Sequence, residues 1–190
     1  MIFSGGCYLA CSPLIFLSET TRTTGVLFNN NRGDASDNQR FKLARTLKIM
    51  PSEQFTKVQK IADNIPYLKH LGIEMVDAGE GWVKMKMRFR PEFLQPFVIH
   101  GGAIYSLADA AAAHALMTIV APQEMMTTVE QRINFLRAAK DQDLFCEAKI
   151  ENLGKTLAYA DVSITFADGT LVAKSTATLM RLDRSRYLGK

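Results

Sequence analysis

The sequence predicts an α+β domain in which a curved antiparallel sheet wraps around one long central helix. Residues 102–120 predict the helix, because they contain no Pro, are rich in Ala and Leu, and are apolar on nearly every side. That length corresponds to about five helical turns at about 3.6 residues per turn. Segments with the alternating pattern of strands lie on both sides of the helix, two before it and four after it.

Two short helical segments and two strands precede the central helix. Ser52 is a suitable N-cap for an amphipathic helix that runs to Ala62, and residues 65–72 form a short helix or turn. Two strands then meet at the turn from Gly79 to Gly81. The second strand alternates between apolar and basic residues, so one face is expected to be buried and the other exposed. Its apolar residues are Val83, Met85, Met87 and Phe89, and its basic residues are Lys84, Lys86 and Arg88.

Four strand segments follow the central helix, at residues 125–137, 143–154, 156–166 and 171–182. The last two are joined by Asp168 and Gly169, a dipeptide typical of tight hairpin turns. One helix cannot cover both faces of such a sheet. Its edges and outer face therefore favour contact with a second subunit.

The chain is expected to divide into an N-terminal extension, one domain and a short tail. Residues 20–40 are dense in Thr, Asn, Gly and Asp and have neither a helical nor an alternating period, which is typical of a linker or disordered arm. A translation start at Met50 would give a compact domain, so residues 1–49 are expected to be disordered or an artefact of an upstream start. The domain is expected to cover residues 50–184, with a tail at 185–190.

The composition disfavours nucleic-acid binding, disulfides and membrane anchoring. The formal net charge of +4 comes from scattered Lys and Arg residues without interleaved aromatics, so no nucleic-acid partner is expected. The three cysteines form no CxxC pair, and no His lies near Cys7 and Cys11 at metal-ligand spacing. The first apolar run lacks basic residues and is interrupted by Gly5, Gly6 and Pro13, unlike a signal peptide or anchor. We expect a cytoplasmic protein without a metal.

The start of the central helix carries the main candidate site, in the stretch QPFVIHGGAIYSLAD at residues 95–109. Gly101 and Gly102 have no Cβ atoms, so a ligand can approach the backbone closely there. The first N–H groups of a helix have no intrahelical acceptor and, with the positive end of the helix dipole, can stabilise an oxyanion formed from a thioester or ester carbonyl. The alternative is structural: the two glycines allow a sharp turn or close helix–sheet packing.

Asp109 is the one carboxylate in this apolar helix. It lies seven residues, or about two turns, after Gly102, and therefore projects from the same face as the helix N-terminus. An unpaired buried carboxylate costs about 2 kcal/mol or more. A salt bridge to a distant Arg or a hydrogen bond to the backbone would offset that cost. The functional alternative is a nucleophile or general base beside the oxyanion donors.

Three segments, at residues 95–116, 127–140 and 151–180, carry a resemblance through their order and spacing; they begin QPFVIHGG, TTVEQRINF and ENLGKT. From about Pro66 to Leu182 the chain resembles the hotdog-fold acyl-CoA thioesterases of the phenylacetic-acid-degradation (PaaI-like) type. The resemblance implies a hotdog fold and a homodimer, commonly paired into a tetramer. It also implies active sites at the dimer interface, with an acyl-CoA substrate and no metal or other cofactor.

The resemblance places the family's HGG motif at His100, Gly101 and Gly102, and its helix carboxylate at Asp109, nine positions after the His. In such enzymes a glycine amide of this junction binds the thioester oxygen, and we assign that role to Gly102. The carboxylate serves as nucleophile or general base. His100 has two interpretations, a catalytic base or a junction residue whose ring hydrogen-bonds to the backbone, and we favour the second.

Other residues of the family's site have partial matches. Gln95 is the nearest match to the Asn or Gln that holds the substrate carbonyl or water, although it stands one residue closer to the His than usual. The family's usual Gly before the HGG is absent, and Phe97 and Val98 occupy that region. Thr128, with Thr127 as second choice, matches a Ser or Thr of the other subunit that orients the attacking water.

Three basic residues are candidates for binding the phosphates of CoA, which favour Lys and Arg. Arg137 and Lys140 follow a strand in the segment FLRAAK, and Lys155 lies in the NLGKT turn that resembles the family's CoA-contacting turn. Each alone is also typical of a solvated surface. Together they predict a basic rim for the nucleotide.

The leading interpretation is an acyl-CoA thioesterase, and two others stay open. One is a non-catalytic acyl-CoA binding or sensing module, because a fold does not determine a function. The other is a hotdog dehydratase acting on enoyl-CoA, which is disfavoured because no separate Asp and His motif of that kind is present. The acyl group is not predicted, because the candidate slot residues are adaptable. They are Tyr105, Met117, Met125, Met126 and Phe135.

Overall fold

The structure, a computed structural model, describes residues 52–186. The predicted extension at 1–49 and residues 187–190 of the predicted tail lie outside the described residues. The helices in the described part are α2 (Glu53–Ala62), α3 (Pro66–Leu71) and α4 (Gly101–Met117). The strands are β1 (Ile73–Gly79), β2 (Trp82–Met87), β3 (Glu124–Phe135), β4 (Leu144–Leu153), β5 (Leu157–Thr165) and β6 (Leu171–Asp183). Short 3₁₀ turns, η1 (Pro91–Phe93) and η2 (Arg184–Arg186), follow β2 and β6.

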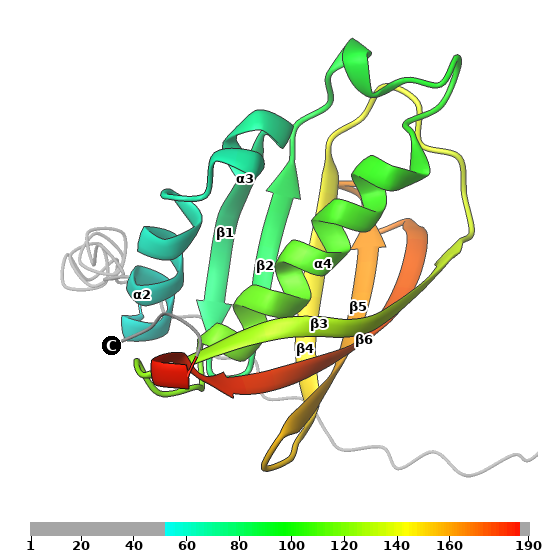
Figure 1. Ribbon diagram of the computed structural model, residues 1–190. Coiled ribbons are helices and arrows are strands. Elements are labelled where there is room, and N and C mark those ends of the chain that lie inside the picture. Colours follow the sequence, from blue (N-terminus) through cyan, green and yellow to red (C-terminus); the bar gives the residue numbers. More distant parts are fainter. Residues whose placement is uncertain (1–51, 187–190) are drawn as a thin grey trace, which may run out of the picture. The chain divides into compact units, whose positions relative to one another are not determined.

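The six strands form one antiparallel sheet in the order β1-β2-β4-β5-β6-β3. Figure 1 shows this sheet curving around α4, which contacts β2, β3, β4, β5 and β6. The two shorter helices, α2 and α3, contact β1 at one edge of the sheet. The predicted α+β fold, with one long helix held inside a curved antiparallel sheet, is confirmed.

The central helix is buried over most of its surface, as its apolar composition predicts. It ends at Met117 rather than at residue 120, because Thr118 ties the helix end to the β1–β2 turn. The Thr118 hydroxyl donates to the Ala115 carbonyl at 2.7 Å and accepts from the Gly81 N–H at 2.8 Å.

No helix among residues 52–186 is long and apolar enough to cross a membrane. The less buried face of α4 carries four small or polar residues: Gly102, Ser106, Asp109 and Ala113.

Strand β2 has the two faces that its alternation predicts. Its apolar residues are buried in the core, which α4 covers, and its lysines lie on the opposite face. Phe89 was included in the predicted strand but lies beyond its end, where its N–H donates to Asp143 Oδ1 at 2.8 Å. The buried residues of this strand are Val83, Met85 and Met87.

Strand β3 is an edge of the sheet and contains a bulge that matters for the site. Its pairing with β6 shifts between Thr128 and Glu130, which leaves Val129 outside the regular ladder. Side chains of a regular strand alternate between faces, so residues three apart would point in opposite directions. Because of the extra residue, Thr128 and Gln131 both point toward α4, where each forms a hydrogen bond.

Candidate active site

Backbone hydrogen bonds hold the loop that leads into α4. The Gln95 N–H donates to the Val98 carbonyl at 2.8 Å, which forms a tight turn just before the helix. The Ile99 N–H donates to the Ala139 carbonyl at 2.7 Å, which joins this loop to the loop between β3 and β4. The residues on either side of the HGG junction are therefore fixed before any side chain is considered.

His100 is the N-cap of α4, and its ring accepts a hydrogen bond from one of the candidate oxyanion donors, the Gly102 N–H. Its Nδ1 atom accepts a hydrogen bond from the Gly102 N–H at 2.8 Å. Nδ1 accepts this bond through its ring lone pair. The amide selected from sequence, that of Gly102, is thus already engaged within the chain. The Gly101 N–H precedes it in the first helical turn, where amides have no intrahelical acceptor.

Gly101 lies at a cavity of about 410 Å³ together with two other candidate residues, Gln95 and Arg137. Phe135, at the end of β3, forms another wall of this cavity. A Cβ atom on Gly101 would lie 3.0 Å from Phe135 Cζ, which is closer than ordinary contact, so glycine permits the close approach of this ring. The structure therefore brings Gln95, Gly101 and Arg137 together at the N-terminal end of α4.

Asp109 lies near the middle of α4 and is half-buried. Its Oδ1 atom accepts a hydrogen bond from the Thr128 hydroxyl at 2.7 Å. Within residues 52–186 it forms no ion pair, so the distant Arg that sequence left open as a partner is not there. Within one chain, Thr128 therefore lies beside Asp109. The second choice, Thr127, is exposed.

The two groups of candidate residues lie too far apart on one helix to act on one carbonyl group. Eight residues separate Gly101 from Asp109, which corresponds to about 12 Å at about 1.5 Å per residue. An oxyanion donor lies about 3 Å from the carbonyl oxygen, and an attacking oxygen lies about 3 Å from the carbonyl carbon. One chain therefore presents two incomplete halves of a site.

The three candidate cations do not form one rim within a chain. Arg137 and Lys140 lie in the loop between β3 and β4, near the N-terminal end of α4. Lys155 lies in the hairpin between β4 and β5, at the other end of β4. The ten residues of β4 span about 30 Å at about 3.3 Å per residue. All three side chains are exposed.

Two other chemically reactive side chains are buried and play a packing role. His114 lies one turn beyond Ala110, whose carbonyl is 2.7 Å from Nδ1, and burial lowers the pKa of its imidazole. Burial also raises the pKa of the Cys146 thiol, so this thiol stays protonated. Among residues 52–186, no three His, Cys, Asp or Glu side chains are grouped so that they could hold a metal ion.

Gln131 and Tyr105 form a pair that sequence did not single out as part of the site. The Gln131 Nε2 donates to the Tyr105 carbonyl at 3.3 Å, and the Tyr105 hydroxyl donates to the Gln131 carbonyl at 3.2 Å. The remaining amide oxygen, Gln131 Oε1, is buried and has no hydrogen-bond partner among residues 52–186. The alternation of a regular strand would place Gln131 opposite Thr128, and only the bulge at Val129 brings both to α4.

Comparisons with known proteins identify the family of this chain. Residues 98–173, from the loop before α4 to the start of β6, match the Thioesterase superfamily. A protein of Archaeoglobus fulgidus named "Putative esterase" is 30% identical over 115 residues, which cover 60% of this chain and 73% of that protein.

Solved structures of similar proteins have the same fold. A thioesterase family protein from Silicibacter pomeroyi is 27% identical with a TM-score of 0.64, and the match covers 68% of this chain and 98% of that chain. The E. coli PaaI protein from the phenylacetic acid degradation operon is 24% identical with a TM-score of 0.63, and the match covers 68% of this chain and 93% of that chain. The chain therefore belongs to the thioesterase superfamily and is a hydrolase of thioesters with the hotdog fold.

Proposed function

We propose that the protein hydrolyses acyl-CoA thioesters at sites that two copies of the chain complete. One observation carries this proposal: Asp109 with Thr128, and Gly101 with Gln95 and Arg137, are two half-sites about 12 Å apart on one helix. A two-fold axis that sets two α4 helices antiparallel would place each Asp109 opposite the partner's Gly101. Two complete sites would result from one symmetric contact.

The surface of α4 suits such a contact. Gly102, Ser106, Asp109 and Ala113 are spaced four, three and four residues apart and so form one face of the helix. Their side chains are small or short, which allows a second helix to approach closely. The midpoint between Gly101 and Asp109 falls at Tyr105, so the axis would pass near this residue. The free edge of β3 lies on the same side of the domain as this face, because Thr128 contacts Asp109.

The half-sites supply the groups that thioester hydrolysis needs. The N–H of Gly101 donates to the thioester carbonyl oxygen and stabilises the negative charge that develops there. The carboxylate of the partner's Asp109 either attacks the carbonyl carbon or removes a proton from an attacking water. The C–S bond then breaks, and CoA leaves as a thiolate that takes up a proton. In the first case a second attack by water releases the acid from Asp109.

Thr128 and His100 position these reacting groups. The Thr128 hydroxyl donates to Oδ1 of Asp109, so Oδ2 is left to act on the carbonyl carbon or on water. The His100 ring holds the Gly102 N–H and so fixes the first turn of α4, from which the Gly101 N–H projects. For this reason the proposed oxyanion contact is made by Gly101 rather than by Gly102. Gln95, at the same cavity, is placed to hold the carbonyl group or water.

The proposed two-fold axis would bring the candidate CoA-binding cations of two chains close together. Arg137 and Lys140 lie near the N-terminal end of α4, and Lys155 lies at the opposite end of the sheet. Antiparallel pairing sets opposite ends of two chains side by side, so Lys155 of one copy would approach Arg137 of the other. Arg and Lys side chains at that position suit the phosphates of CoA.

The test compares the wild-type protein with the Asp109→Asn and Asp63→Asn variants. Release of free CoA is measured with a thiol reagent, and binding of acyl-CoA is measured by calorimetry. We expect Asp109→Asn to lower kcat by about 100-fold or more while the dissociation constant changes little. Asp63 is exposed at the end of α2, so its variant is the matched control. Binding without turnover by the wild type would favour the non-catalytic module instead, and full activity of Asp109→Asn would refute the mechanism.

A further inference from the structure

A second cavity, of about 360 Å³, lies at the C-terminal end of α4. Residues of α2 and of the start of β3 form its other walls, and Arg184 of η2 lies at its margin. Its volume falls in the range of small-molecule sites, which are lined mainly by apolar side chains with a few polar groups. The apolar lining includes Ile61, Met117, Val120, Pro122, Met125 and Met126.

We propose that this cavity, lined by Met117 and Met126, receives the hydrocarbon chain of the acyl group, so that the protein acts on medium- or long-chain acyl-CoA. This inference rests on the proposed hydrolysis of acyl-CoA at Asp109. It adds the class of acyl group and the residues that select it.

The cavity lies close to the reacting carboxylate along both β3 and α4. Met126 is two residues from Thr128 on the same face of β3, which corresponds to about 7 Å at about 3.3 Å per residue. Met117 is eight residues beyond Asp109 on α4, or about 12 Å along the helix. Between Asp109 and Met117 the less buried face of α4 carries only Ala113. A chain attached to a carbonyl at Asp109 therefore meets a small side chain first and the cavity next.

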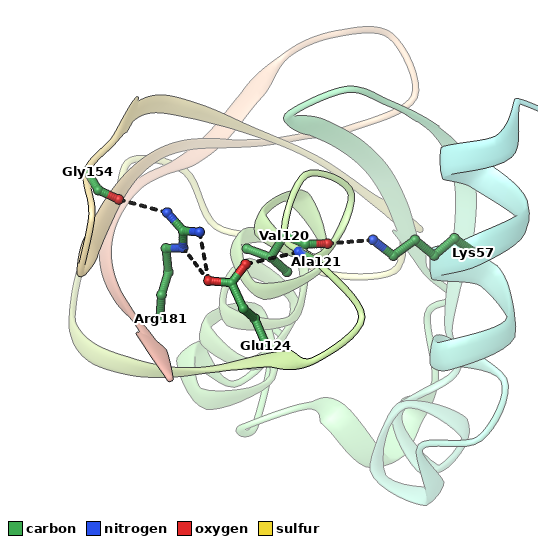
Figure 2. Close-up of polar contacts among 6 residues, drawn as sticks. All are labelled: Lys57, Val120, Ala121, Glu124, Gly154 and Arg181. Atoms are coloured by element: carbon green, nitrogen blue, oxygen red, sulfur yellow. Dashed lines mark hydrogen bonds and ion pairs between the residues drawn. The ribbon is translucent and has the colours of Figure 1, made fainter. Parts of the chain in front are cut away.

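Two charged residues at this cavity, Lys57 and Glu124, are already engaged, and the third, Arg184, is exposed at the margin, which leaves the interior to an apolar ligand. Figure 2 shows Lys57 of α2 reaching the turn that follows α4, where its Nζ donates to the Val120 carbonyl at 2.8 Å. In the same figure, Glu124 accepts from the Ala121 N–H at 3.0 Å.

Glu124 also forms an ion pair that anchors the cavity to the neighbouring hairpin. Arg181 of β6 lies 2.7 Å from Glu124 Oε1, and its Nη1 donates to the Gly154 carbonyl at 3.0 Å (Figure 2). Both side chains are about four-fifths buried, with 23% and 22% of their surfaces exposed. These bonds satisfy the carboxylate and the guanidinium. The Arg181 guanidinium is therefore not free to bind a phosphate group of a nucleotide, and the Glu124 carboxylate would repel one, whereas an alkyl chain needs no polar partner.

Methionine is the characteristic residue of this lining. Met117, Met125 and Met126 are each partly buried, and an unbranched thioether side chain adapts to ligands of different shape. The cavity is thus suited to a range of chain lengths rather than to one rigid ring. The two outer-face cavities differ, because no methionine is among their lining residues.

The test measures kcat/KM of the full chain for acetyl-, hexanoyl-, decanoyl- and palmitoyl-CoA. For the wild type we expect kcat/KM to rise by up to about fourfold for each methylene group that enters the cavity. Met117→Trp should lower the ratio of decanoyl to acetyl turnover by at least about tenfold, because the indole fills the space. Met117→Ala should move the preference toward palmitoyl-CoA. Met180→Trp, on the other face of β6 from buried Leu179, is the matched control and should keep the wild-type ratio.

Three results would overturn this inference: no dependence on chain length in the wild type, unchanged ratios in both Met117 variants, or an equal loss for every substrate. An equal loss would indicate that the CoA arm, not the acyl chain, passes through the cavity. Absence of turnover with all four substrates would instead contradict the proposed function itself. Binding of decanoyl- and acetyl-CoA to Asp109→Asn, with and without Met117→Trp, gives a readout of chain recognition that does not require catalysis.

Discussion

Thr128 Oγ1 donates to Asp109 Oδ1 at 2.7 Å, and this hydrogen bond joins the middle of the central helix to the edge strand of the sheet. Asp109 has no ion-pair partner among residues 52–186, so the hydroxyl is the polar group that supports its charge within one chain. A hydrogen bond to a charged group is worth about 1.5–3 kcal/mol. This contact orients the carboxylate and also occupies one of its two oxygens.

Removal of that hydroxyl is expected to impair the reaction more than binding. Thr128→Val keeps the shape of the side chain but leaves Asp109 without its donor, so kcat should fall by about tenfold or more, with a smaller change in KM. Thr128→Ser keeps a hydroxyl and should recover much of the rate. Steady-state kinetics with one acyl-CoA checks both variants. The same change at exposed Thr127 separates the two candidate threonines, and a larger loss there would show that Thr128 was chosen wrongly.

Two inactive variants are expected to restore activity to each other if each site combines two chains. Asp109→Asn removes the carboxylate, and Gly101→Val places a branched side chain where a Cβ already comes within 3.0 Å of Phe135. In a mixed dimer one site carries both changes and the other carries neither. Co-expression in equal amounts should therefore give about a quarter of the wild-type activity, since about half of the dimers are mixed.

Thiol release by the purified mixture, compared with each variant alone, is the measurement. The matched control mixes Asp109→Asn with Thr128→Val, which damage the same half-site. That mixture should recover far less activity, because the mixed dimer retains one weakened half-site and one inactive half-site. Equal recovery in both mixtures would contradict a site shared in the proposed way.

Much of the fold could be predicted from local patterns of apolar and polar residues in the sequence. Alternation in β2 correctly separates Val83, Met85 and Met87 from the lysines, and the Ala-rich run correctly predicts a buried α4. The C-terminal end of α4 could not be predicted from composition, because Ile119 and Val120 are as apolar as the residues before Thr118. A side-chain hydrogen bond from Thr118 to the Ala115 carbonyl, made beside the turn at Gly81, ends the helix there.

The sequence predicted only those parts of the site where a residue differs clearly in chemistry from its neighbours. Asp109 is recognisable because it is a carboxylate in an apolar helix. Gly101 and Gly102 are recognisable because two adjacent residues without side chains leave the backbone accessible to a ligand. The bulge at Val129, which turns Thr128 toward Asp109, depends on pairing between β3 and β6 and has no local sequence signal. The separation of Lys155 from Arg137 likewise depends on the direction of β4 across the sheet, not on sequence spacing.

The cap formed by His100 is expected to stabilise the fold and to order the HGG junction. His100→Ala removes the acceptor of the Gly102 N–H, and loss of an N-cap costs about 1 kcal/mol. His100→Asn keeps a side-chain acceptor and should lose less. Urea unfolding of both variants gives the difference in the free energy of unfolding. If the two variants are equally stable and as stable as the wild type, the cap has no energetic role.

The free energy of unfolding is expected to depend on pH through the ion pair between Glu124 and Arg181. The Ala121 N–H and, after it, the Arg181 guanidinium hold the pKa of Glu124 below its ordinary value, despite partial burial of the carboxyl group. Because the folded-state pKa is the lower one, the unfolded chain binds more protons between the two values. The contribution to stability is therefore present above the ordinary Glu pKa and is lost as pH falls through the folded-state value.

Glu124→Gln removes this dependence, since an amide does not titrate in that range. The difference in the free energy of unfolding between the wild type and Glu124→Gln should favour the wild type at neutral pH and shrink as the solution is acidified. Denaturant unfolding at a series of pH values measures it. Exposed Glu92, varied to Gln, is the matched control, and its difference from the wild type should stay nearly constant. A difference for Glu124→Gln that grew on acidification would show that the carboxylate is destabilising in the folded state.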